Sequence, residues 1–190
     1  IELYKNEDLQ TALVESRKLE EQFPKSINLK NFMGALYVAL NEYVAAIESY
    51  QFILEQKPNS IETYNNLATV YLKLDEPSKA HDILKSAVAL SPDNPKIHFK
   101  IGNVYRTNKQ FEKAIKHYYL AIKYQPDFIN AKSSLVEVLI EVGQLNEAEN
   151  LLRDSSSDGI LSDNALINLS KIYIKQKRLN AAISQLKKVV

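Results

Sequence analysis

Apolar residues along the chain recur in pairs of helical stripes. In the segment 61–94, the first stripe consists of Ile61, Tyr64, Leu67, Ala68, Tyr71 and Leu72. The second stripe consists of Ala80, Ile83, Leu84, Ala87 and Val88. Spacings of three and four residues predict one amphipathic helix for each stripe. Pro77 lies between the stripes, and proline is favoured in the first turn of a helix, so we expect it to open the second helix.

The same pair of stripes repeats every 34 residues. One column holds alanine throughout: Ala12, Ala46, Ala80, Ala114, Ala148 and Ala182. A second column holds proline: Pro24, Pro58, Pro92 and Pro126. No insertion or deletion interrupts the period, which predicts an array of like units rather than one central core.

Turn-forming residues occupy the positions between the predicted helices. Asn41, Asp75 and Gly143 share the column between paired helices, and these residue types accept the left-handed conformation that ends a helix. The prolines of the second column are expected to end each second helix. A nearby serine or asparagine can cap the next first helix, and the candidates are Ser26, Ser60 and Asn94.

The period divides the chain into a partial repeat at 1–26, four repeats at 27–60, 61–94, 95–128 and 129–162, and a partial repeat at 163–190. We predict a single array over 1–190. The fifth unit departs from the pattern, because residues 154–159 read Asp-Ser-Ser-Ser-Asp-Gly where its second helix should still run. We therefore expect that helix to end early, with a longer loop or a bend before the last repeat.

The columns resemble the tetratricopeptide repeat (TPR) family. Positions are counted from Ile27, Ile61, Pro95, Ile129 and Asp163. Position 7 then holds Met33, Leu67, Ile101, Leu135 and Leu169, and position 8 holds Gly34, Ala68, Gly102, Val136 and Ser170. The resemblance covers the whole chain and implies an all-α fold, a right-handed TPR α-solenoid of antiparallel helix pairs. It further implies a scaffold that binds other proteins or extended peptides.

Composition narrows the function classes. There are 24 basic and 23 acidic residues, a net charge of +1, so nothing calls for a nucleic-acid or membrane partner. With no cysteine, thiolate chemistry is excluded, and a reducing cytoplasmic setting is expected. His81, His98 and His117 lack metal-ligand spacing. We therefore predict no catalytic residue, no cofactor and no metal, that is, a protein that is not an enzyme.

The resemblance places the binding surface on the first helix of each repeat, mainly at positions 2, 5, 6, 9, 12 and 13. The polar candidates carried over to this chain are Asn31, Asn65, Asn66, Lys73, Lys96, Lys100, Asn103, Arg106, Asn168 and Lys171. Amides can pair with the backbone of an extended peptide, and cations can pair with its carboxylates. We therefore expect a partner with acidic residues in a concave groove.

Two subfamilies and one longer architecture offer alternatives. Chaperone-binding TPRs grip a terminal carboxylate; Asn66, Lys96 and Lys100 match that clamp, with lysine in place of arginine at the last position, whereas Asn31 and Ala35 do not match. O-linked GlcNAc transferases carry asparagine at position 6, which is met here by Asn66 and Asn168 only. The stretches 23–26 and 64–67 are similar to TPR segments before bacterial sulfotransferase or glycosyltransferase domains. The alternative to a scaffold is therefore an array that recruits substrates or partners for a transferase domain outside this chain.

Both ends of the chain fall inside predicted helices. Ile1 takes position 9 of a first helix, and Val190 takes position 28 of a second helix. We expect the chain to be part of a longer protein. We also expect self-association through the uncovered apolar faces at its ends.

Overall fold

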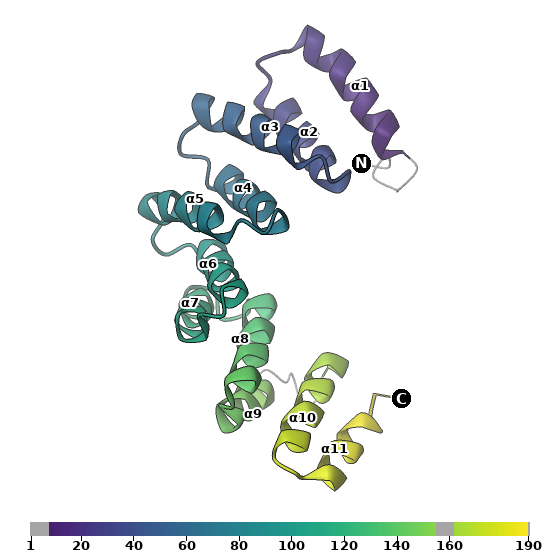
Figure 1. Cartoon of the computed structure of the whole chain (residues 1–190), viewed down its shortest axis with the longest axis vertical. Coiled ribbons are helices and arrows are strands. Elements are labelled where there is room, and N and C mark those ends of the chain that lie inside the picture. The colour runs from purple at the N-terminus through teal and green to yellow at the C-terminus, as the bar shows by residue number, and fades with distance from the viewer. Residues whose placement is uncertain (1–7, 155–161, 190) are drawn as a thin grey trace. The chain divides into compact units, whose positions relative to one another are not determined.

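The computed structural model describes residues 8–154 and 162–189. These residues form eleven α-helices and no strand (Figure 1). Contacts group the chain into two units, Ile1–Lys100 and Ile101–Val190, and the boundary falls inside one helix. The all-α prediction is confirmed.

The helices alternate between the first and second helices of successive repeats. The first helices are α2 (Ile27–Ala39), α4 (Ile61–Lys73), α6 (Pro95–Thr107), α8 (Ile129–Val142) and α10 (Asp163–Lys175). The second helices are α1 (Leu9–Gln22), α3 (Tyr43–Gln56), α5 (Pro77–Leu90), α7 (Phe111–Tyr124), α9 (Leu145–Asp154) and α11 (Leu179–Leu186). From α2 onward, the first residues of like helices are 34 positions apart, which confirms the predicted period.

The turn between paired helices uses one left-handed residue in each of the five repeats from residue 27 onward. Asn41 and Asp75 have φ of 61° and 57°, and Gly143 has φ of 85°, as their residue types predict. Lys109 and Lys177 take the same conformation, with φ of 55° and 61°. Lysine has no side-chain feature that favours the left-handed conformation, so the residue types at positions 109 and 177 did not predict these two turns.

Helix ends follow the proline and cap signals with one correction. Pro77 and Pro95 are the first residues of α5 and α6. Ser26 Oγ accepts from Leu29 N at 3.3 Å, and Asn94 Oδ1 accepts from Lys96 N at 3.0 Å. The cap assigned to Ser60 was wrong: its hydroxyl lies 2.8 Å from the Thr63 hydroxyl instead, because a side chain three residues on competes with the backbone for it.

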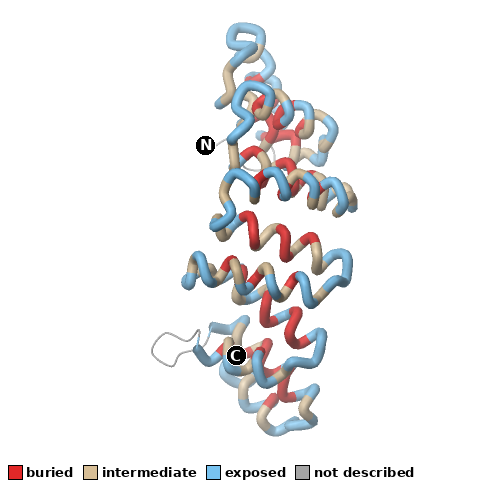
Figure 2. The backbone as a smooth tube through the Cα atoms, turned by 90° about the vertical axis from the view of Figure 1, so that its left-hand side faces the viewer, coloured by how far each residue is buried: buried red, intermediate tan, exposed pale blue. Residues whose placement is uncertain are grey.

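The first unit has a continuous apolar core between its helix pairs. Leu36, Ala46, Ile53 and Leu67 are at most 1% exposed and belong to one cluster that extends from α1 to α4. Figure 2 shows buried residues recurring along the helices, with exposed residues at the turns. Complete burial of a leucine or isoleucine contributes about 1.5–3 kcal/mol, so contacts between neighbouring helices supply most of the stabilisation.

The second unit repeats this arrangement. Leu135 and Leu139 of α8 are buried, as are Leu169 and Ile172 of α10, and α10 contacts both α8 and α9. The described part of α9 has 10 residues, against 14 in α7. The early end and long loop predicted for this repeat depend on residues 155–161, which lie outside the described residues.

On α11, the apolar side chains of Ile183 and Leu186 are 51% and 42% exposed. Self-association through this face stays a prediction.

Paired helices meet where position 8 faces position 24. A Cβ built on Gly102 would lie 2.5 Å from Cε1 of Tyr118, and one on Gly34 would lie 2.7 Å from Cε1 of Tyr50. Both tyrosines are at most 2% exposed. The two repeats with glycine at position 8 have tyrosine at position 24, and the three with a larger residue at position 8 have leucine there. The absent side chain therefore makes room for the ring.

Gly102→Ala should lower the free energy of unfolding by about 1–3 kcal/mol, because the rigid ring of Tyr118 must move. Combined with Tyr118→Leu, the same substitution should cost less than in the wild-type background, since alanine opposite leucine already occurs as Ala68 with Leu84. Urea denaturation of the four proteins of this cycle measures the coupling. Strict additivity of the two substitutions would show that the ring and the glycine do not oppose each other.

Lys109→Gly should raise stability by up to about 1 kcal/mol, because glycine adopts positive φ without the steric cost that lysine has there. Thr107→Gly, at the last residue of α6, is the matched control and should lower stability by about 0.3 kcal/mol, because glycine has a lower helix propensity than threonine. Thermal denaturation followed by circular dichroism distinguishes the two. A loss of stability in both variants would contradict the strained turn.

Candidate functional site

Neighbouring first helices contact each other through residues 31 positions apart. Lys100 Nζ of α6 donates to Thr69 Oγ1 of α4 at 2.6 Å. Arg106 of α6 pairs with Glu137 Oε2 of α8 at 2.7 Å. An offset of 31 equals one repeat less about one helical turn, so position 9 of one repeat lies beside position 6 of the next, and position 12 beside position 9. These are the positions from which the predicted binding residues were taken.

In the first unit, three of these polar side chains belong together. Asn66 lies one turn before Thr69 on α4, so the two share a helix face. The hydroxyl of Thr69 donates to the carbonyl of Asn65 at 2.8 Å and accepts from Lys100, and it thereby fixes the ammonium on this face. We call Asn66, Thr69 and Lys100 the Lys100 site.

The ammonium of Lys100 is partly withdrawn from water. Burial lowers the pKa of Lys100 from its ordinary value of 10.5. Among the described residues, its hydrogen-bond partner is the Thr69 hydroxyl, and none of their carboxylates is paired with it. A partly desolvated cation next to a neutral oxygen has an unmet preference for an anion.

The other predicted residues of the first unit differ in accessibility. Lys73 is exposed at the C-terminal end of α4, and Lys96 is exposed at the N-terminal end of α6. Asn31 on α2 is partly buried. Asn65 is 8% exposed, and its Oδ1 has no hydrogen-bond partner among the described residues. Its burial makes it less accessible to a partner than Asn66, which is only partly buried.

In the second unit, the predicted residues are engaged by their own neighbours. Asn103 Oδ1 accepts from the hydroxyl of Tyr118 at 2.8 Å, and burial raises the pKa of Tyr118 to about 12, which keeps that donor protonated. Arg106 is already paired with Glu137. The prediction counted Arg106 together with Lys100 as a cation for the peptide, but of these two only Lys100 has no carboxylate partner among the described residues.

Asn168 and Lys171 lie beside each other on α10. Lys171 Nζ donates to Asn168 Oδ1 at 3.3 Å, and Asn168 is 9% exposed. Both residues line a hollow of about 200 Å³ between α8 and α10, together with Glu137, Ile140, Glu141 and Lys175.

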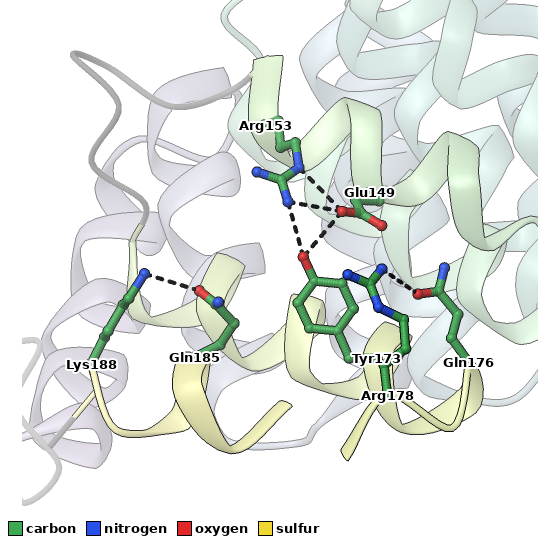
Figure 3. Close-up of polar contacts among 7 residues, drawn as sticks. All are labelled: Glu149, Arg153, Tyr173, Gln176, Arg178, Gln185 and Lys188. Atoms are coloured by element: carbon green, nitrogen blue, oxygen red, sulfur yellow. Dashed lines mark hydrogen bonds and ion pairs between the residues drawn. The ribbon is translucent and has the colours of Figure 1, made fainter. Parts of the chain in front are cut away.

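A polar cluster that the sequence did not reveal joins α9 to α10 (Figure 3). Arg153 donates to Glu149 Oε1 at 2.9 Å and to the Tyr173 hydroxyl at 2.9 Å, and that hydroxyl donates to Glu149 at 3.1 Å. The guanidinium of Arg178 lies 4.5 Å from the centre of the Tyr173 ring. Because Glu149, Arg153 and Tyr173 satisfy one another's hydrogen bonds, these three groups support the contact between α9 and α10.

Metal-ligating side chains do not gather in the part of the chain that the structure describes. No group of three or more His, Asp or Glu side chains there could hold a metal ion. His98 is 5% exposed, and its Nε2 lies 2.7 Å from the carbonyl oxygen of Pro92, which is the role in packing expected from its column. In the same residues, no helix is long and apolar enough to cross a membrane.

Comparisons with known proteins agree with the repeat geometry. Three family models, each described as Tetratricopeptide repeat, match residues 38–98, 95–128 and 163–190, which together exceed half of the chain. The chain belongs to the tetratricopeptide repeat family.

Among curated proteins, Tetratricopeptide repeat protein 17 of Homo sapiens is 41% identical over 49 residues, and the proteins of that name from Rattus norvegicus and Mus musculus match equally. The match takes 26% of this chain and spans 4% of the relative's length.

Solved structures share the fold at low identity. PilW, a type IV pilus biogenesis factor, has a TM-score of 0.82 at 22% identity, covering 96% of this chain and 85% of PilW. MamA has a TM-score of 0.71 at 21% identity, covering 86% and 89%. YrrB, described as a TPR protein with an unusual peptide-binding site, has a TM-score of 0.65 at 19% identity, covering 92% and 90%. These likenesses show a TPR solenoid fold.

Lys100→Met should raise the free energy of unfolding near pH 7 by about 0.5–1 kcal/mol, because it removes the cost of burying an ammonium. In this variant the Thr69 hydroxyl keeps its hydrogen bond to the carbonyl of Asn65, so the substitution leaves no buried polar group without a partner at this hydroxyl. The folded pKa of Lys100 lies below the unfolded value, so the unfolded chain binds the extra proton and the gain should shrink as pH rises towards 10.5.

The matched control for this stability measurement is Lys96→Met, an exposed lysine one turn earlier on α6, which should be nearly neutral. Urea denaturation at several pH values compares the two variants. A destabilised Lys100→Met with a neutral Lys96→Met would mean that the ammonium bond stabilises the stack.

Proposed function

We propose that this array is a non-catalytic interaction scaffold that binds an extended peptide along its first helices, with a carboxylate of the peptide at the Lys100 site. The observation that carries the proposal is the ammonium of Lys100, partly buried and bonded to a hydroxyl rather than to a carboxylate. The family and its solved relatives, one of them described by its peptide-binding site, support a role in protein interaction.

An extended peptide suits this surface better than a helical one. A helix has already satisfied its own backbone groups, whereas an extended chain presents amides and carbonyls that Asn66 can pair with. Lys96 and Lys100 lie one turn apart on α6, so a second acidic side chain can meet Lys96. The charge on this face therefore favours a partner with acidic residues.

The transferase alternative uses the same surface. An array that recruits substrates for a catalytic domain elsewhere in a longer protein would also bind them along the first helices. It stays a prediction, as does the resemblance to transferase-linked TPR regions.

A peptide display library selected against the chain should be enriched in sequences with aspartate or glutamate. For a selected peptide, Lys100→Met should raise the dissociation constant at least about tenfold, the equivalent of about 1.4 kcal/mol. Arg106→Met should change it less than about threefold, because Glu137 already takes that guanidinium. Affinity should also fall with salt, since the charges are partly exposed. Fluorescence anisotropy measures all three effects.

Lys85→Met, an exposed lysine on the second helix α5, is the matched control and should leave affinity unchanged. Equal affinities for wild type and Lys100→Met would place the peptide elsewhere. A larger loss for Arg106→Met than for Lys100→Met would mean that the carboxylate displaces Glu137, and it would overturn the assignment to the Lys100 site.

A further inference from the structure

The hollow between α8 and α10 carries charges of both signs on opposite walls. Glu137 and Glu141 come from α8, and Lys171 and Lys175 come from α10. Ile140, which is 7% exposed, contributes an apolar surface between them. All of these residues belong to the second unit, and the offset of 31 explains the meeting of Glu137 with Asn168 and of Ile140 with Lys171.

These charges do not neutralise one another across the hollow. Glu137 is directed to Arg106, and Lys171 donates only to the neutral amide of Asn168. Within the described residues, neither Glu141 nor Lys175 makes a hydrogen bond or an ion pair. Opposite charges that line one hollow and stay apart leave an acid on one wall and two cations on the other for a ligand.

We propose that this hollow is a dipolar subsite for a partner segment that carries one basic and one acidic side chain. The basic side chain meets Glu141, the acidic one meets Lys171 and Lys175, and an apolar side chain between them covers Ile140. The proposal rests on the peptide-binding function above and adds that the partner is of mixed charge in this unit, rather than acidic throughout.

The helix spacing limits how far apart the two charges of the partner lie. Packed helices have axes about 8–10 Å apart, and an extended chain advances about 3.3 Å per residue. A segment that crosses from α8 to α10 therefore places its basic and acidic residues about three positions apart. A helical partner would need a different spacing between its charged residues.

The test uses three capped peptides with a central leucine and charged residues three positions apart. One peptide has a lysine and a glutamate, one has two glutamates, and one has two lysines. In NMR titrations of the 190-residue chain, the mixed peptide should bind about two- to fivefold more tightly than either of the others. The largest amide shifts should be in α8 and α10.

In the variant Glu141→Lys, the charged side chains of the hollow that lack an ion-pair partner are all lysines. This variant should therefore prefer the peptide with two glutamates. Glu112→Lys, an exposed acid on α7, makes the same change of charge outside the hollow and should keep the wild-type preference. Equal affinities for the three peptides, shifts confined to other helices, or an unchanged preference in Glu141→Lys would overturn the subsite. If Lys100→Met still weakens its selected peptide, the subsite alone fails and the proposed function stands.

Discussion

The contact between position 8 of a first helix and position 24 of its partner governs how this chain is built. Where position 8 is Gly34 or Gly102, a tyrosine ring fills the space, and a Cβ there would come within 2.7 Å of that ring. Where position 8 is larger, leucine replaces tyrosine at position 24. The summed volume is thus kept within limits, which interiors packed at crystal-like density require. The chain thus shows five pairs of residues at positions 8 and 24.

The first helices of neighbouring repeats also contact each other directly. Neighbouring first helices are related by one repeat less about one helical turn, so residues 31 apart become neighbours. Thr69 with Lys100 and Arg106 with Glu137 follow from this single offset. The proposed binding surface therefore depends on the repeat geometry as much as on the residues that occupy it.

Sequence reasoning identified the helices because alanine, proline and turn residues recur in fixed columns. It missed the left-handed Lys109 and Lys177, since their conformation is imposed by the repeat and not by the residue type. It also treated Lys100 and Arg106 as equivalent cations. Their difference depends on which groups the neighbouring repeat supplies: a hydroxyl in one case and a carboxylate in the other. The periodicity of the sequence identified which positions face the candidate groove. The hydrogen-bond partners of Lys100 and Arg106 could be identified only once the offset between neighbouring helices was known.

The central claim is that the partly buried ammonium of Lys100 binds a carboxylate of a peptide. The pKa of this group, measured by NMR of the lysine side chain in the free chain and with a selected acidic peptide, tests the claim most directly. The account predicts a pKa below 10.5 in the free chain, because burial disfavours the charge, and a rise when the peptide carboxylate is bound. A free value at or above 10.5, or a value that does not change when the peptide binds, would contradict it.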